Sequence, residues 1–175
     1  MLVITTLTRS SPALILAALL TTPTLVSAQG VEDRVAVIEL SNALDAAVDA
    51  KDWTTARSYF TDEIEVAMGD GAGESMPADD LIGSWETYLY EGKPSYHLRG
   101  GHRVTFEDAD TGVVESQGYA WNLIEGFEGG ELWEVWGSYA FDVVRTEDGW
   151  RLASFAFAPH HTRGNDAVPG HVPGN

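Results

Sequence analysis

His97 and Asp49 are the side chains in this sequence that we expect to carry acid–base chemistry. An imidazole exchanges protons near neutral pH, and a carboxylate that accepts one ring N–H fixes which nitrogen is free to act as the base. Such a pair can remove a proton from carbon and return it to a leaving oxygen, as eliminations, isomerisations and cyclisations require. A structural alternative is also open, with His97 as a half-buried strand residue and Asp49 as a solvated acid at a helix end, one turn after Asp45.

A pair of glycines follows His97 within residues 96–101, and strand-forming residues then continue from Arg103 to Phe106. Adjacent glycines favour a β-bulge, because they lack the side chain that restricts other residues to regular strand geometry. Such a bulge would aim His97 into a cavity beside the sheet. In an unbroken strand His102 would face away from His97, so only the bulge can bring the two histidines to the same side.

Polar and aromatic residues on other segments are the candidates for contacting a substrate. Tyr59 and Tyr139 have hydroxyl groups that can donate a hydrogen bond to a carbonyl or leaving oxygen. Strand alternation places Asn122 on one face and Trp121 on the other, so at most one of these two lines a given cavity. Three tryptophans are candidates for an aromatic lining that would suit a flat aryl or polycyclic ligand: Trp85, Trp121 and Trp136.

Cysteine is absent from the sequence, which excludes thiol nucleophiles, thiolate metal sites and disulfides. The adjacent residues His160 and His161 would point to opposite faces of a strand, and no spacing of His and carboxylate residues matches a metal site. We therefore predict that the site uses neither a metal ion nor a cofactor.

The 175-residue chain has a net charge of −17, which argues against nucleic acids and anionic membranes as partners because both bind clustered Lys and Arg. Residues 1–28 contain one charged residue, Arg9, followed by a short apolar run and the small-x-small sequence 26–28. This pattern predicts a secretory signal peptide cleaved between Ala28 and Gln29, with a retained anchor as the alternative. Cleavage would remove Arg9, change the net charge from −17 to −18, and leave a periplasmic or secreted protein without a membrane segment.

Apolar residues recur at helical spacing from Val31 to about Ala50, which predicts an amphipathic helix. Asp52 is placed to cap a second helix that runs to Phe60, and Pro77 to begin a third helix that runs through Leu89. Between these helices the sequence predicts a short strand at 63–67 and a flexible acidic loop at 69–74. Four longer strands follow, separated by turns rich in Asp and Gly: 96–107, 112–125, 131–145 and 150–158.

Three helices followed by strands with short connections predict an α+β fold. In this fold the helices pack on a strongly curved antiparallel sheet and enclose a pocket. The domain would cover residues 29–163, and residues 164–175, rich in Gly and Pro, would form a flexible tail. Several strands are apolar on both faces, so we expect the outer face of the sheet to pair with a second copy as a homodimer.

Across about residues 31–163 the chain resembles the SnoaL-like branch of the nuclear transport factor two-like superfamily, and within it scytalone dehydratase and the bile acid dehydratases. Residues 49–53, Asp-Ala-Lys-Asp-Trp, are similar to the end of the first helix in these dehydratases, where a catalytic aspartate lies. Residues 96–101 are similar to the His-x-x-Gly-Gly start of a strand, where a catalytic histidine lies. The resemblance implies the cone-shaped fold, with His97 as the base and Asp49 as its orienting partner.

The resemblance also places Asn122 in the cavity, at a position where the dehydratases have histidine in one branch and aspartate in another. This chain has an amide there, which does not transfer protons at neutral pH. The Ser/Asn pair of scytalone dehydratase would fall near Gly137 and Tyr139, so that pair is not preserved.

The function that we expect from these residues is a cofactor-independent lyase acting on a small apolar or aromatic hydroxylated molecule. His97 and Asp49 would carry out a dehydratase-type elimination. The alternatives are a carbon–carbon lyase that releases a small aldehyde from an aryl compound, an isomerase or cyclase of the same fold, and a non-catalytic binding protein for an apolar ligand. Asn122 in place of an acid favours the binding protein, whereas His97 together with Asp49 favours the lyase.

Overall fold

A computed structural model of the protein describes residues 30–174, so the predicted signal peptide lies outside the described residues. In the part of the chain that is described, no helix is both long and apolar enough to cross a membrane. The elements follow one another in this order: α1 (Val31–Asp49), α2 (Trp53–Ser58), β1 (Phe60–Met68), β2 (Glu74–Pro77), α3 (Ala78–Tyr88), β3 (Ser95–Phe106), β4 (Thr111–Leu123), β5 (Leu132–Thr146), β6 (Gly149–Gly164) and α4 (Ala167–Gly170).

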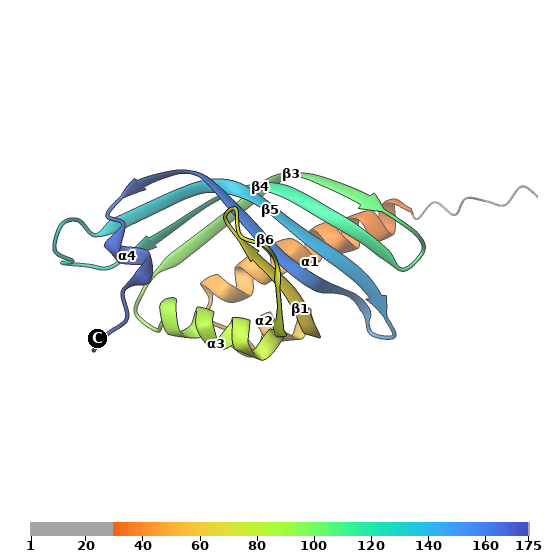
Figure 1. The fold of residues 1–175 in the computed structure, drawn as a ribbon, viewed down its shortest axis with the longest axis horizontal. Coiled ribbons are helices and arrows are strands. Elements are labelled where there is room, and N and C mark those ends of the chain that lie inside the picture. Colours follow the sequence, from red (N-terminus) through yellow and green to blue (C-terminus); the bar gives the residue numbers. More distant parts are fainter. Residues whose placement is uncertain (1–29, 175) are drawn as a thin grey trace, which may run out of the picture.

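The strands form one curled sheet of six strands in the order β2-β1-β6-β5-β4-β3. From β3 to β6 the chain makes the antiparallel meander that the sequence predicts. In contrast to the purely antiparallel sheet that we expected, β1 pairs with β6 in parallel. After β1 the chain forms β2, α3 and the strands β3, β4 and β5. It then returns with β6, which lies beside β1 and runs in the same direction (Figure 1).

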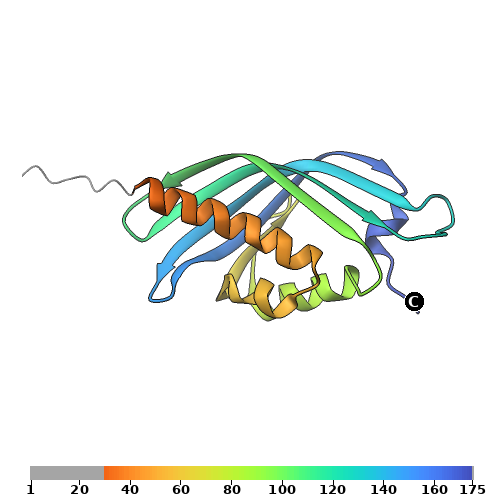
Figure 2. The same cartoon turned by 180° about the vertical axis from the view of Figure 1, so that it is seen from behind.

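The concave side of this sheet is closed by α1, α2 and α3, as the α+β prediction requires (Figure 2). Helix α1 runs beside the edge strand β3, and its buried residues Val37, Leu44 and Val48 contribute to the core. Phe141 on β5 is fully buried in the same core. Burying a side chain of this size contributes about 1.5–3 kcal/mol to stability, so truncating Phe141 to alanine would destabilise the fold.

The predicted boundaries of the first and third helices lie within about one residue of those in the structure, whereas α2 ends at Ser58, earlier than predicted, because Phe60 already begins β1. Asp52 caps α2, since its side chain accepts a hydrogen bond from the backbone N–H of Thr55 at 3.1 Å. Pro77 precedes the first residue of α3, Ala78, and serves as the N-cap residue. The loop predicted at 69–74 is shorter than expected, because Glu74 begins β2, which pairs with β1.

The C-terminal segment differs from the flexible tail that the sequence predicts. Strand β6 extends to Gly164, and Val168 on α4 is fully buried. The side chain of Lys93, also fully buried, donates hydrogen bonds to the carbonyl oxygens of Tyr88 at 2.9 Å and Pro169 at 3.0 Å. The composition of the segment alone could not indicate that it is ordered, because its packing depends on a lysine more than seventy residues earlier in the sequence.

The predicted bulge is present in β3, where the pairing with β4 shifts register between Gly100 and Arg103. Gly101 has a φ of 64°, a left-handed conformation that glycine adopts at low cost. As a result His97, Arg99 and His102 lie on the same side of β3. Their side chains are less exposed than those of the residues next to them in the strand.

Candidate active site

Asp49 is the last residue of α1, and the turn that follows it is built from backbone hydrogen bonds. The N–H of Lys51 donates to the carbonyl of Val48 at 3.0 Å, and the N–H of Asp52 donates to the carbonyl of Ala47 at 2.9 Å. This is the Schellman pattern of helix termination, in which one residue takes a left-handed conformation. Here that residue is Lys51, with φ 58°, and a non-glycine residue pays about 1–2 kcal/mol for it.

The strained turn directs Lys51 back toward Asp49. The Lys51 ammonium donates to the hydroxyl of Ser95 at 2.7 Å, and that hydroxyl donates to Oδ1 of Asp49 at 2.9 Å. A carboxylate at the C-terminal end of a helix faces the negative end of the helix dipole. The positive charge of Lys51 and the hydrogen-bond donors of β3 compensate for this unfavourable position.

Asp49 holds His97 through two separate contacts. Nδ1 of the imidazole lies 2.7 Å from Oδ1 of Asp49, and the backbone N–H of His97 donates to Oδ2 at 2.7 Å. The carboxylate therefore orients the ring. It also accepts a hydrogen bond from a backbone N–H that would otherwise be unpaired on the free edge of β3. The side chains of both residues are 18% exposed, so the pair is largely shielded without being sealed from solvent.

The ionisation of Asp49 determines which nitrogen of His97 carries the proton. Burial opposes ionisation, but hydrogen bonds from His97 and Ser95 outweigh burial and hold the pKa of Asp49 below its usual value. An ionised carboxylate only accepts hydrogen bonds, so the proton of the neutral imidazole is assigned to Nδ1. This leaves the lone pair of Nε2 free to act as a base.

An ion pair lies beside this hydrogen-bonded pair, between the same two elements. Arg99 Nη2 donates to Oδ1 of Asp45 at 2.6 Å, and the two side chains are 2% and 9% exposed. Asp45 and Asp49 are four residues apart on α1, a rise of about 6 Å. His97 and Arg99 are two residues apart on β3, which spans about 7 Å. The two spacings match, so the helix and strand form two neighbouring contacts, the His97–Asp49 hydrogen bond and the Arg99–Asp45 ion pair.

The pair of Asp45 and Arg99 was not predicted from the sequence, in which Asp45 stands out only as a solvated neighbour of Asp49. Two spacings could have indicated the pair: Asp45 and Asp49 lie four residues apart on a helix, and His97 and Arg99 lie two residues apart on a strand. These spacings become informative only once the helix and strand are known to be neighbours.

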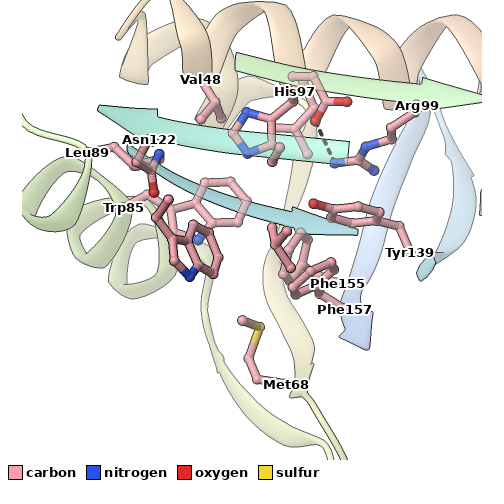
Figure 3. A pocket seen from close by; sticks show the side chains of 15 residues that line it. Val48, Met68, Trp85, Leu89, His97, Arg99, Asn122, Tyr139, Phe155 and Phe157 are labelled. Carbon is pink, nitrogen blue, oxygen red and sulfur yellow. Dashed lines mark hydrogen bonds and ion pairs between the residues drawn. The ribbon is translucent and has the colours of Figure 1, made fainter. Parts of the chain in front are cut away.

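An apolar cavity of about 150 Å³ opens beside His97, on the concave side of the sheet (Figure 3). This volume is close to that of an engineered protein cavity that holds one benzene ring. Its walls come from α1, α3 and all strands except β2. The residues that line it are Leu44, Asp45, Val48, Met68, Trp85, Leu89, His97, Arg99, Ala120, Asn122, Trp133, Val135, Tyr139, Phe155 and Phe157.

Among the predicted substrate contacts, the structure places Asn122 and Tyr139 in this cavity. Ala120 pairs directly with His97 across the strands, so Asn122, two residues further along β4, lies on the same face. The Asn122 amide donates to the backbone carbonyl of Trp121 at 3.1 Å.

Tyr59 and Trp121 do not line the cavity, in contrast to our prediction. Tyr59 follows α2 and packs against the core from outside the cavity. Trp121 points to the convex face because of strand alternation, and its ring stacks on Tyr96 with the centroids 6.2 Å apart. Trp133, which the sequence analysis did not single out, supplies an indole to the cavity wall instead.

The bulge brings His102 to the same side of β3 as His97, which an unbroken strand would not allow. Burial lowers the pKa of His102, and the nearby positive charge of Arg99 acts in the same direction. The described residues contain no group of three or more His, Asp or Glu side chains that could hold a metal ion. We therefore assign none of the described residues to a metal ion.

Residues 29–156 match the family model of the SnoaL-like domain. A search of curated proteins found no match. Among solved structures, the Kfla4162 protein from Kribbella flavida has a TM-score of 0.73 and 24% identity, covering 80% of this chain and 98% of that one.

Two further solved structures resemble this fold. A proposed scytalone dehydratase from Novosphingobium aromaticivorans has a TM-score of 0.69 and 14% identity, covering 82% of this chain and 95% of its own. The hexachlorocyclohexane dehydrochlorinase LinA type 3 from Novosphingobium barchaimii has a TM-score of 0.62 and 18% identity, covering 81% of this chain and 95% of its own. At these identities the likeness establishes the curled-sheet fold.

Proposed function

This chain belongs to the SnoaL-like domain family, and on that premise we propose that it is a cofactor-independent lyase. Its substrate would be a small apolar or aromatic hydroxylated molecule. The observation that carries the proposal is the 2.7 Å contact between Asp49 and Nδ1 of His97, beside an apolar cavity that His97 lines. Solved neighbours of the fold include proteins named for the loss of water and of hydrogen chloride, which are both eliminations.

In the proposed reaction, Nε2 of His97 removes a proton from a carbon atom of the substrate. The electron pair of that C–H bond forms a carbon–carbon double bond, and the C–O bond at the neighbouring carbon breaks. The protonated imidazole gives its proton to the departing oxygen, so water is released and His97 returns to its starting state. Asp49 stays ionised throughout, fixes the ring and stabilises the imidazolium that forms.

The size of the cavity sets the expected substrate class. A volume of about 150 Å³ accommodates one aromatic ring rather than a polycyclic skeleton. The aromatic walls favour a planar ring: the rings of Trp85 and Phe155 meet edge to face, with centroids 5.1 Å apart. We therefore propose a single-ring aryl alcohol or hydroxy-ketone.

The test is turnover of a panel of single-ring aryl alcohols and hydroxy-ketones, followed by mass spectrometry for loss of water or of a small aldehyde. We expect water loss with the wild type and a large decrease with His97→Ala. Release of an aldehyde would instead support the carbon–carbon lyase. A substrate lost equally fast with both proteins would contradict the role of His97.

A binding protein for an apolar ligand is the second candidate, favoured by the amide of Asn122 where the related dehydratases have an acid. It predicts saturable binding of aryl compounds without turnover of any. In that case His97→Ala would change affinity only modestly, because the apolar walls supply most of the binding.

We also propose that the protein is exported and that its convex face pairs with a second copy. Mass spectrometry of the mature protein from its native host should find Gln29 as the first residue. Tyr96, Leu98 and Leu132 expose 45%, 55% and 37% of their surface, which supports pairing of the sheet. Light scattering at micromolar concentration should give the mass of a dimer, and a monomer mass would refute the pairing.

A further inference from the structure

Arg99 is a buried cation whose hydrogen-bonding capacity is only partly used. Its Nη2 binds Asp45, whereas within the described residues its Nε and Nη1 atoms are buried without a hydrogen-bond partner. Its guanidinium carbon lies 4.0 Å from the ring centroid of Tyr139 and 4.6 Å from that of Phe141. Because buried polar groups are normally satisfied, an incompletely paired cation at a cavity wall calls for an explanation.

Tyr139 lines the same cavity beside this cation. The ring lies against the Arg99 guanidinium, and the hydroxyl is on the side of the ring that faces His97 (Figure 3). The residue is 6% exposed and lines the cavity, and its hydroxyl makes no hydrogen bond to any described residue. Burial raises the pKa of Tyr139 to about 12, so the hydroxyl stays protonated and remains a donor.

The position of the Tyr139 ring is set by the neighbouring strand. A Cβ atom placed on Gly118 of β4 would collide with Cε2 of the ring, so the glycine makes the space that the ring occupies. The rings of Phe155 and Phe157 also pack against the Tyr139 ring, at centroid distances of 6.2 and 4.6 Å, and restrict its movement. The free hydroxyl is therefore held in place before any ligand arrives, which is the arrangement required of a preorganised donor.

The charges around the hydroxyl indicate what kind of oxygen it would bind. Arg99 is balanced by Asp45, and the carboxylate of Asp49 lies one helical turn away. A carboxylate ligand would place a third anion beside these two, whereas a neutral carbonyl oxygen adds no charge. When charge develops on that oxygen, the positive guanidinium against the Tyr139 ring stabilises it.

We propose that the Tyr139 hydroxyl, supported by the Arg99–Asp45 pair, binds the carbonyl oxygen of the substrate opposite His97. This inference rests on the proposed lyase function and narrows its substrates to single-ring aryl ketones or aldehydes with a hydroxyl group on the β-carbon. Tyr139 contacts the reacting group, whereas Arg99 is a positioning residue that acts through Tyr139.

The proposed step balances without any added reactant. His97 Nε2 takes the proton from the carbon next to the carbonyl, and the electron pair moves to the carbonyl oxygen as an enolate that Tyr139 holds. The pair then returns to form the carbon–carbon double bond and expels the β-hydroxyl group. That group takes the proton from His97 and leaves as water, giving an unsaturated carbonyl product.

Two ligands of nearly the same shape test the carbonyl contact. Acetophenone has the carbonyl oxygen, and α-methylstyrene has a CH₂ group in its place. Neither has a leaving group, so binding is measured without turnover. Tyr139→Phe keeps the ring on Arg99 and removes only the hydroxyl, and we expect it to weaken acetophenone binding about 3- to 10-fold while leaving α-methylstyrene binding unchanged.

Tyr59→Phe is the matched control, because it removes a tyrosine hydroxyl outside the cavity and should alter neither affinity. Equal weakening of both ligands by Tyr139→Phe would assign Tyr139 to packing and overturn the proposal. So would unchanged acetophenone affinity in Tyr139→Phe, or the absence of saturable acetophenone binding to the wild type.

A spectroscopic measurement tests Arg99 separately. The carbonyl ¹³C resonance of labelled acetophenone should move downfield on binding to the wild type, as it does when a ketone accepts a hydrogen bond. The shift should be largely lost in Tyr139→Phe and reduced in Arg99→Lys, which keeps the charge opposite Asp45 but lacks the planar group over the ring. A full shift in Arg99→Lys would overturn the role of Arg99.

These outcomes are separable from the fate of the lyase proposal. If Tyr139→Phe behaves as the wild type while His97→Ala abolishes water loss from an aryl alcohol, the carbonyl site is wrong and the lyase stands. If the carbonyl contact is present but no compound is turned over, the protein is a carbonyl-binding module instead.

Discussion

The two faces of the sheet have similar sets of chemical groups but use them differently. On the concave face, His97 and Arg99 meet carboxylates from α1, and Tyr139 lies beside them. On the convex face, the hydroxyl of Tyr119 donates to Glu134 at 2.7 Å, and Arg163 donates to the other oxygen of Glu134 at 2.6 Å. A histidine is present there as well, His161, with its ring 5.4 Å from that of Trp136.

The difference lies in which groups remain available and what surrounds them. Tyr119, Glu134 and Arg163 satisfy one another through hydrogen bonds to both oxygens of Glu134. Tyr139 and Arg99 keep donors without partners among the described residues, and both line the cavity between the sheet and the helices. Residue type alone therefore does not identify the functional face, whereas enclosure together with unmet hydrogen-bonding capacity does.

Removing a histidine from each face gives the largest expected difference. His97→Ala should lower turnover of a confirmed substrate by about 10²–10⁴-fold, the usual effect of losing a general base, with little change in melting temperature because the side chain fills a cavity wall. His161→Ala removes the same side chain from the convex face and should retain activity. Steady-state kinetics and thermal melts of both variants make the test, and equal loss of activity in the two would erase the distinction between the faces.

Neutralising one carboxylate on each face should give a smaller effect. Asp49→Asn keeps the shape but loses the charge that fixes the Nδ1–H form of His97, so turnover should fall by about 10-fold or more while remaining above that of His97→Ala. Glu134→Gln is the convex-face control and should stay close to wild type. Nitrogen-15 NMR of the imidazole should show a change in the population of the two neutral forms in Asp49→Asn; an unchanged ring spectrum would mean that Asp49 does not orient His97.

The stability contributed by Asp49 should depend on pH in a defined direction. The fold lowers the pKa of Asp49, so the ionised carboxylate is more stable in the folded state than in the unfolded state. Its contribution is fully present above the unfolded pKa of about 3.9 and is lost as pH falls through the lower folded value. Urea unfolding should thus show wild type more stable than Asp49→Asn by about 1–3 kcal/mol at neutral pH, with the gap narrowing below about pH 4. A gap that widens on acidification would reverse the assignment.

A charge introduced on the convex face should have the smallest effect on chemistry. Leu98→Lys places an ammonium where the side chain is 55% exposed, so turnover should stay within about twofold of wild type. If the convex faces pair, the same change should shift the mass measured by light scattering from dimer to monomer. Val35→Lys is the matched control, since Val35 is an exposed apolar residue on α1, 44% exposed, and away from the sheet face. Identical masses for the two variants would argue against pairing through this face.

Features that depend on neighbouring residues could be predicted from the sequence alone. The end of α1 at Asp49 follows from the loss of apolar periodicity, and the cap of α2 follows from Asp52. The bulge after His97 follows from two adjacent glycines. Alternation along β4 separates Asn122 from Trp121, although it does not show which of them faces the cavity. These are local steric and hydrogen-bonding rules that act within a few residues, so the order of amino acids is sufficient to express them.

Features that depend on distant residues appeared only in the tertiary structure. Asp45 meets Arg99 across 54 residues of sequence, and Lys93 reaches Pro169 across 76. Neither contact has a local pattern, because each exists only after the meander has curled and placed α1 against β3 and α4 beside the end of α3. Burial then determines the chemistry of these side chains, since an ion pair or hydroxyl removed from water interacts far more strongly with its partner than the same groups do at the surface.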